Sequence, residues 1–555
     1  MKTFFWYDLE TSGLSSRFDR IMQFAGIRTD ENFKQIGESV NILIKLTDDI
    51  LPSPEALLVT KITPQATLQD GLTEAEFAKF FLDEIATPDT IIVGYNNVRF
   101  DDEFIRNFLW RNFRDPYEWS WSEGRSRWDL LDVVRLVRAL RPDGINWPFK
   151  KVSICHPELV SGSNSNNKTE ILKQVQNDNA KVRNNKEILI PTNTLEALAR
   201  DNGFENKNAH DALADVQALI NVAKLIKDKQ PKMFDYLLKM RNKKEVMKLV
   251  NLENPAPFVY ASGRYSAEFE KTTVAFPVAP ATKQGAVLVW DLRVSPDDFA
   301  NLSEKEILAK ITADWSTRSQ KDFVPLPVKE LTYNKCPAVA PLNTLDESAQ
   351  KRLHLDLSDI KKNLASLQNN RGLLDKISAA FATKNTHFVA TNNNTVIASD
   401  AKQSPANQQK STASPDVESK LYNSFTPAED KIKVRAVASA NANDLADFHP
   451  TFIDERLPEL LLRYKARNFA KSLTADEKTL YEDWRSAKIL REIPAFMQKL
   501  AWLAAIGRGE EPQKLSDDDQ KQFSTLKSRI PREKVNEFVL EELQLWAESI
   551  IPTEY

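Results

Sequence analysis

The sequence predicts three regions: an α/β region at the N-terminus, a β-rich region in the middle and an all-helical region at the C-terminus. The first third alternates short apolar runs with stretches of helical spacing. The middle contains the apolar stretches TTVAFPVA and GAVLVWDL, with Pro and Gly between them. Beyond Thr426, apolar residues recur three or four positions apart. A chain of 555 residues has room for these regions, since a domain takes roughly 150 residues.

The composition is that of a folded globular protein. Hydrophobic residues make up 42% and charged residues 28% of the chain, which argues against a disordered or fibrous protein. No stretch approaches the ~18 apolar residues of a membrane-spanning helix, and the start MKTFFWYDLETSG reaches acidic residues too early for a signal peptide. We therefore expect a cytoplasmic protein without a membrane segment. The net charge of -3 gives no global sign of nucleic-acid binding, so such a function would need local patches.

Within the α/β region, strands and helices follow in order. Strands are predicted at Thr3–Leu9, Gln23–Arg28, Asn41–Leu46 and Thr90–Tyr95. Helices are predicted over the apolar spacing from Leu130 to Leu140, in the segment TNTLEALARDNG, and from Asp211 to about Lys229. Strands followed by helices favour a layered sheet. In the C-terminal region, Thr474 and Glu477 form a capping-box pattern that predicts a helix start.

Two polar segments interrupt these patterns. Residues from Lys151 to Ile190 contain SGSNSNNKTE and QNDNAKVRNNK, and residues from Thr391 to Asp416 are similarly poor in large apolar side chains. Such composition is typical of loop insertions. We therefore predict domains at 1–229, with an insertion at about 151–190, at 230–382, and at 383–555, with an insertion at about 391–416.

Asp8 and Glu10 are the first candidates for chemistry. They end the first predicted strand two positions apart, so both carboxylates lie on the same face. Mg²⁺ prefers oxygen ligands and commonly takes one or two protein carboxylates together with substrate phosphate. The alternative is an ordinary pair of surface acids.

Three further residues complete the pattern. Asp101 follows a predicted strand, where it could simply cap a helix. His210 precedes the predicted helix that carries Asp215 in its first turns. Such a histidine is commonly structural or solvated, but here it stands five positions from an acid.

In order and type, these residues resemble the DEDDh exonucleases: a DxE pair, an aspartate about ninety residues later, and HxAxxD. The segments FDRIMQFAGIRTD, VGYNNVRFDDEFIRNFLWRNF, KNAHDALADV and RYKARNF further resemble the bacterial exodeoxyribonuclease I family. The resemblance implies an RNase H-like α/β exonuclease domain with a mixed sheet and flanking helices, an SH3-like β domain, and an all-α C-terminal domain that together embrace single-stranded DNA.

The four carboxylates Asp8, Glu10, Asp101 and Asp215 could not all ionise in one cleft without opposing positive charge, because each raises the pKa of its neighbours. Two Mg²⁺ ions, with Mn²⁺ as an alternative, would supply that charge and promote phosphodiester hydrolysis. His210 is suited to act as the general base, and Asp101 belongs to the catalytic set. The resemblance implies 3′→5′ degradation of single-stranded DNA to 5′-mononucleotides in repair and recombination. It also implies that Glu10 contacts the terminal nucleotide.

Arginine and aromatic residues alternate between Arg99 and Arg141, where all nine basic residues are arginine, against eight acids. Arginine binds phosphate and stacks on bases, and aromatic rings stack on bases. From this segment we predict DNA contacts by Arg106, Tyr117, Trp121 and Arg135.

A basic segment from Lys224 to Lys248 carries nine cations against three acids. It could be an ordinary solvated face, or a surface that follows phosphates or docks a partner. The family resemblance implies one such partner, the acidic C-terminal tail of single-stranded DNA-binding protein. We expect a monomer. Two alternatives to a DNA exonuclease stay open, an exoribonuclease of the DEDDh group and a non-catalytic single-strand clamp.

Overall fold

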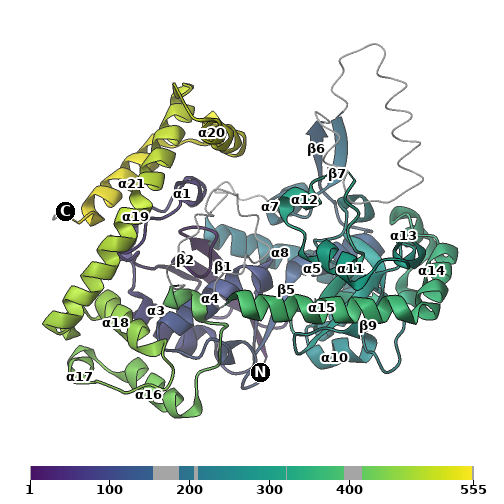
Figure 1. Ribbon diagram of the computed structural model, residues 1–555, viewed down its shortest axis with the longest axis horizontal. Helices are drawn as coiled ribbons and strands as arrows, with labels where there is room; N and C mark the ends of the chain where they lie inside the picture. Colours follow the sequence, from purple (N-terminus) through teal and green to yellow (C-terminus); the bar gives the residue numbers. More distant parts are fainter. Residues whose placement is uncertain (1, 154–186, 205–210, 321, 393–415, 553–555) are drawn as a thin grey trace. The chain divides into compact units, whose positions relative to one another are not determined.

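The computed structural model describes residues 2–153, 187–204, 211–320, 322–392 and 416–552 (Figure 1). The chain divides into two compact units. Unit 1 comprises Met1–Ser126, Lys207–Gln217 and Asn394–Tyr555, and unit 2 comprises Arg127–Asn206 and Ala218–Asn393. None of the helices in the described ranges combines the length and apolar character needed to cross a membrane. The three predicted domain boundaries stay predictions.

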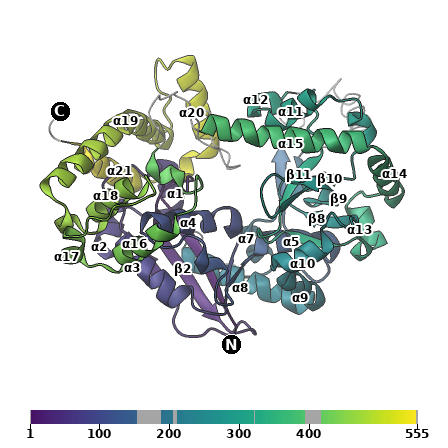
Figure 2. The same ribbon diagram turned by 60° about the horizontal axis from the view of Figure 1, so that its bottom comes forward.

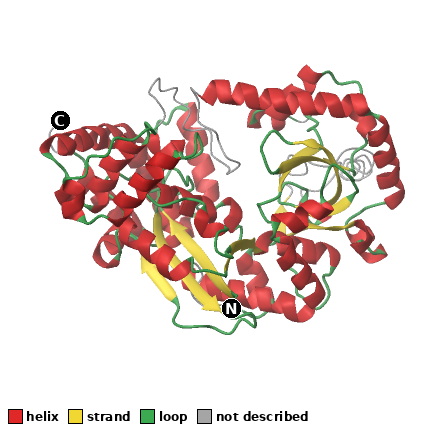
Figure 3. Ribbon diagram, turned by 90° about the horizontal axis from the view of Figure 1, so that it is seen from below, coloured by secondary structure: helices red, strands yellow, loops and turns green. Residues whose placement is uncertain are grey.

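Unit 1 begins with a mixed sheet, visible as strands in Figure 3. Strands β1 (Thr3–Thr11), β2 (Ile21–Thr29), β3 (Val40–Leu43) and β4 (Thr90–Gly94) lie in the order β3-β2-β1-β4. β1 pairs antiparallel with β2 and parallel with β4. The parallel pair requires a crossover, which contains α1 (Pro54–Thr60), α2 (Pro64–Asp70) and α3 (Glu74–Phe80). Strand β5 (Ser126–Asp129) begins at Ser126, the last residue of the first chain segment of unit 1.

The core of this sheet is aromatic. Phe5, Phe24, Phe77 and Phe108 pack together, so that α3 and helix α4 (Asp101–Arg111) contact the sheet through phenylalanine rings. Burying such rings supplies much of the stabilisation of a core. The predicted strands are confirmed, with no end differing by more than three residues.

Helices form the rest of unit 1. They are α16 (Ala428–Ser439), α17 (Ala442–Ala446), α18 (Leu457–Asn468), α19 (Ala475–Arg508), α20 (Asp517–Arg529) and α21 (Glu537–Ile550). The predicted capping box is confirmed, because Thr474 caps α19 and Glu477 returns the hydrogen bond. Met22 of β2 and Leu57 of α1 share an apolar cluster with Leu503 and Leu543, so these C-terminal helices pack on the sheet region within the same unit (Figure 2).

Unit 2 contains a second sheet, entirely antiparallel. Strands β8 (Phe258–Ala261), β9 (Thr272–Pro280), β10 (Ala286–Asp291), β11 (Val328–Thr332) and β12 (Ala338–Pro341) lie in the order β11-β10-β9-β8-β12. The same unit holds α5 (Leu130–Leu140), α7 (Leu195–Asp201) and most of α8 (Ala212–Lys229).

The β-rich interpretation of the middle region was incomplete. It also contains α9 (Pro231–Met240), α10 (Lys243–Leu249), α11 (Glu304–Thr312), α12 (Trp315–Arg318), α13 (Glu347–Arg352), α14 (Leu357–Asn369) and α15 (Arg371–Asn392). Most are short, so each shows too few turns for a clear helical period. Their start signals are present nevertheless, since Ser303 and Glu306 form a capping box at α11.

The ends of the first predicted insertion are ordered strands rather than loop. β6 (Phe149–Ser153) and β7 (Glu187–Pro191) pair antiparallel, with Lys151 opposite Leu189. Arg138 supports this hairpin by donating to the carbonyls of Pro148 and Thr192, at 3.0 and 2.7 Å. Residues 154–186 and 393–415, the greater part of both predicted insertions, lie outside the described residues.

Candidate metal centre

Asp8 and Glu10 sit on β1, which lies between β2 and β4 in the sheet. The two-residue period of a strand directs both carboxylates to one side, as predicted. Asp8 is opposite Ala25 and Glu10 opposite Gln23, and the register shifts between Glu10 and Thr11. The carboxylates therefore stand where regular pairing of the strand ends.

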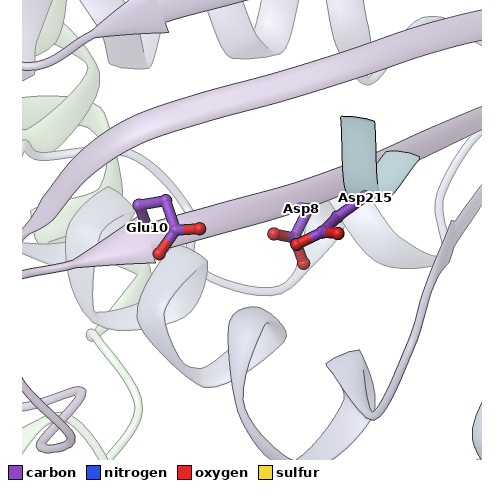
Figure 4. A group of neighbouring side chains, drawn as sticks. All are labelled: Asp8, Glu10 and Asp215. Atoms are coloured by element: carbon purple, nitrogen blue, oxygen red, sulfur yellow. The ribbon is translucent and has the colours of Figure 1, made fainter. Parts of the chain in front are cut away.

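Asp215 comes from the first turn of α8. Asp211 fixes that helix start, because its carboxylate accepts the backbone N–H of Leu213 at 3.1 Å. One carboxylate oxygen from each of Asp8, Glu10 and Asp215 lies within 4.8 Å of the other two (Figure 4). All three side chains are half-buried. Oxygen ligands at this spacing, with part of the site open, suit a hard divalent cation that also binds substrate and water.

Asp101 is the first residue of α4 and is buried. The residue before the helix is Phe100, so Asp101 does not serve as the N-cap. The charge of Asp101 is the largest electrostatic contribution to the raised pKa of Asp8, second only to burial. Its neighbour Asp102 instead accepts hydrogen bonds from Tyr7 Oη at 2.8 Å and Asn97 Nδ2 at 3.2 Å. Of the two adjacent acids, Asp101 therefore acts on the carboxylate group and Asp102 supports the core.

The electrostatics of the group favour a bound cation. Burial, followed by the charges of Asp101, Glu10 and Asp215, raises the pKa of Asp8 well above its ordinary value. Burial and the charges of Asp215 and Asp211 raise the pKa of Glu10 to about 7. Because α4 and α8 begin here, their positive ends offset part of this repulsion. A divalent cation would offset much more, and the donor set fits one.

His210 lies outside the described residues, so its place beside the carboxylates stays a prediction.

Two of the four predicted DNA contacts lie together in unit 1. Arg106 of α4 forms an ion pair with Glu103 at 2.9 Å, and its guanidinium lies 5.8 Å from the ring centre of Tyr117. The C-terminal region adds two aromatic residues that the sequence analysis missed. Tyr422 donates from its hydroxyl to Glu103, and Phe425, 83% exposed, meets Tyr117 edge to face at 6.0 Å.

The other two predicted contacts lie elsewhere. Trp121 is 64% exposed. Its near neighbour Glu123 accepts, at its backbone carbonyl, the N–H of Asp89, the residue directly before β4. Since β1 and β4 are parallel, this is the opposite end of the strand pair from Asp8. Arg135, in unit 2, pairs with Asp132. These roles stay predictions.

Comparison with known proteins assigns the chain to a family. An exonuclease family model matches residues 5–156, the Exonuclease I SH3-like domain matches 241–383, and the Exonuclease I C-terminal domain matches 415–528. Exodeoxyribonuclease I of Haemophilus influenzae is 37% identical over 503 residues, which cover 90% of this chain and 93% of that protein. The chain belongs to the exodeoxyribonuclease I family. Exodeoxyribonuclease I of Escherichia coli is 36% identical, with 90% of this chain and 92% of that protein covered.

Solved structures of exonuclease I agree in fold. The Escherichia coli exonuclease I complex with a dA16 oligonucleotide matches at a TM-score of 0.78 and 34% identity, covering 99% of this chain and all of that one. Exonuclease I of Methylocaldum szegediense matches at 0.77 and 32%, with both chains fully covered. Other related structures are a zinc-bound complex of the Escherichia coli enzyme with single-stranded DNA, and SSB/Exonuclease I in complex with the inhibitor CFAM.

Proposed function

We propose that this exodeoxyribonuclease I family member is a metal-dependent 3′→5′ exonuclease, which degrades single-stranded DNA to 5′-mononucleotides during repair and recombination. The observation that carries the proposal is the convergence of Asp8, Glu10 and Asp215 within 4.8 Å, beside the charge of Asp101. Family membership agrees with this activity, because relatives across 90% of the chain carry the name exodeoxyribonuclease I.

The proposed metal ligands are Asp8, Glu10, Asp101 and Asp215, and the proposed ions are two Mg²⁺, with Mn²⁺ as an alternative. When bound, such ions lower the pKa of the attacking water and stabilise charge on the leaving oxygen. The chain itself holds the ligands at the end of a strand and at two helix starts, which limits their movement. Glu10 is also proposed to contact the terminal nucleotide.

His210 is proposed as the general base, and Asp101 as part of the catalytic set. The imidazole of histidine titrates near neutral pH, with an unperturbed pKa of roughly 6.5, so it can accept a proton from water and release it again. His210 is two residues before α8, the helix that carries Asp215. That short separation along the chain supports the assignment.

Arg106, Tyr117, Trp121 and Arg135 are proposed to contact the DNA strand, combining stacking with phosphate binding. Arg106 and Tyr117 are supported further by their contact, because Arg106 of α4 forms a cation–π pair with Tyr117 in the same unit as the carboxylates. The basic segment Lys224–Lys248, which runs through α9 and α10, is proposed to dock the acidic tail of single-stranded DNA-binding protein.

The direct test is a time course on single-stranded DNA labelled at either its 3′ or its 5′ end. We expect immediate release of a 3′-labelled mononucleotide, delayed release of the 5′ label, and complete inhibition by a chelator. An RNA strand of the same sequence should be degraded at least about tenfold more slowly, since it differs at each 2′-hydroxyl. Faster RNA degradation would favour the exoribonuclease alternative. Binding of DNA without any product would favour a clamp.

A further inference from the structure

A buried ion network connects the C-terminal region with the elements that carry the metal centre. At its middle is Glu418, on the short 3₁₀ helix Val417–Lys420, with 3% of its surface exposed. Its carboxylate contacts Arg467 at 2.6 Å, Arg20 at 3.0 Å and Arg463 at 3.2 Å, and Arg111 lies at 3.9 Å. All of these residues belong to unit 1.

Arg20 ties this network to the end of β1. Its backbone N–H donates to Ser12 Oγ at 2.8 Å, and its carbonyl accepts the N–H of Ser12 at 2.9 Å. Its guanidinium also donates to the carbonyl of Phe18 at 2.9 Å. Ser12 stands two residues after Glu10, so Arg20 closes the loop that directly follows the proposed metal ligands. The position of this loop therefore depends on what holds Arg20.

Arg111 ties the same network to α4. It ends the helix that Asp101 begins, and it pairs with Glu74 at 3.0 Å. Glu74 in turn lies 3.9 Å from the guanidinium of Arg20. A second contact between the loop and the helix is the hydrogen bond from Asn107 to Ser16, at 3.4 Å. The loop after β1 and the helix that carries Asp101 thus share one set of buried charges.

We propose that Glu418 is a positioning residue for the metal centre. By binding Arg20 and approaching Arg111, it holds the loop after β1 against the last turn of α4. Because a helix of this length moves as one rigid element, this contact also limits the position of Asp101, at the other end of α4, relative to Glu10. Guanidinium groups suit this role because they are planar and hold carboxylates in defined geometry. Mg²⁺ demands nearly ideal octahedral coordination, so small displacements of its ligands weaken binding. The inference rests on the proposed exonuclease function.

Glu418→Gln tests the proposal by removing the charge while keeping the shape of the side chain. Ser12→Ala removes one of the two hydrogen bonds that close the loop without disturbing a buried charge, so it keeps the test decisive if Glu418→Gln fails to fold. Asp430→Asn is the matched control. Asp430 is also a fully buried carboxylate of the C-terminal region, but the partners found for it among the described residues, Lys433 and the backbone of Ile453 and Asp454, all belong to that region.

The measurements are Mn²⁺ binding by electron paramagnetic resonance, kcat and KM on a single-stranded oligonucleotide, and the thermal midpoint, all with the full chain. Supporting residues around a metal site commonly change metal affinity by about 10–100-fold. We expect Glu418→Gln and Ser12→Ala to weaken Mn²⁺ binding by about tenfold and to lower kcat similarly, with KM almost unchanged. Asp430→Asn should lower the thermal midpoint without changing Mn²⁺ affinity.

Unchanged Mn²⁺ affinity in folded Glu418→Gln, or in Ser12→Ala if the first variant does not fold, would overturn the proposal. So would an equal loss of affinity in Asp430→Asn, because the effect would then follow stability alone. Mn²⁺ binding separates this inference from the exonuclease assignment. A parent protein that binds Mn²⁺ but degrades no DNA would refute the exonuclease function while leaving the positioning role measurable.

Discussion

Unit 1 contains two groups of partly or fully buried acids, and among the described residues they differ in the charges that act on them. In the ion network, Asp49 contacts Arg467 at 2.8 Å and Lys488 at 3.5 Å, and Glu418 contacts three arginines. In the metal centre, the charges that most affect Asp8 are other carboxylates. Among the described residues, the network thus pairs its carboxylates with cations, whereas Asp8 of the metal centre is influenced mainly by like charges.

The pKa values follow this difference. The cations around Asp49 and Glu418 outweigh burial and lower the pKa of both carboxyls. Burial and like charges raise the pKa of Asp8 and Glu10. Burial alone therefore does not distinguish a structural acid from a functional one. Like charges that raise one another's pKa favour a positive charge supplied from outside, and a divalent cation suits these oxygen ligands.

The same chemical change should have opposite effects in the two groups, and the largest is expected at the metal centre. Asp8→Asn removes a proposed ligand, and we expect at least a thousandfold loss of kcat, about 4 kcal/mol of activation free energy. Because it also removes a repulsive charge, the metal-free variant should be as stable as the parent or more stable. Single-turnover kinetics and calorimetry without metal measure the two effects. Full activity would refute the assignment.

In the ion network, the corresponding change should damage the fold. Asp49→Asn leaves Arg467 and Lys488 without their shared carboxylate, and removing one partner of a buried pair costs about 3–5 kcal/mol. Asp48→Asn is the control, since its side chain is 53% exposed and exposed pairs contribute at most about 1 kcal/mol. Urea unfolding of both variants gives the free energies. Equal stability of the two would show that the network adds nothing to the fold.

The dependence on pH should separate the two groups as well. The pKa of Glu10 rises from 4.5 to about 7 in the folded protein, so without metal its contribution to stability is lost as pH rises through that window. The pKa of Asp49 is lowered from 3.8, so its contribution is present above that value and lost as pH falls below it.

Protons and metal ions compete for the same carboxylates. The stabilisation by Mn²⁺ should therefore grow as pH rises from 5.5 to about 7, the pKa of Glu10, by about 1.4 kcal/mol for each pH unit, and should level off above that pH. The increase in thermal midpoint on adding Mn²⁺ should follow the same course. The measurement is differential scanning fluorimetry at several pH values with and without Mn²⁺. An increase that is the same at every pH would contradict the raised pKa.

The smallest effect is expected away from both charge groups, at Tyr117. Tyr117→Ala should raise KM for single-stranded DNA by about tenfold with little change in kcat, since stacking on a base contributes about 1–3 kcal/mol. Phe538→Ala is a suitable control, because Phe538 is an exposed aromatic residue of α21 for which we propose no DNA contact. Equal KM values for the two variants would remove Tyr117 from the DNA path.

Sequence patterns predicted the local features well. The position of Asp8 and Glu10 on one face follows from strand periodicity, and the start of α19 follows from its capping box. Asp101 was named from its place after the predicted strand, and the family resemblance supported it, but local sequence alone distinguishes it little from the adjacent Asp102. The structure adds a difference between them, the hydrogen bond from Tyr7 to Asp102, which joins residues 95 positions apart.

Long-range pairing was beyond prediction from sequence. Arg20 and Glu418 are 398 positions apart, and no spacing rule relates an arginine after one strand to a glutamate in a distant turn. The aromatic contact of Phe425 with Tyr117 is unpredictable for the same reason. Such contacts depend on how the C-terminal helices fold against the sheet region, which only the tertiary structure provides.

The most direct test of the account is where divalent cations bind. Crystals of the full chain soaked in Mn²⁺ should show anomalous density within coordination distance of Asp8, Glu10 and Asp215, and none in crystals of Asp8→Asn treated in the same way. Ion density elsewhere, or an empty carboxylate group at saturating Mn²⁺, would contradict the claim that these acids form a metal centre.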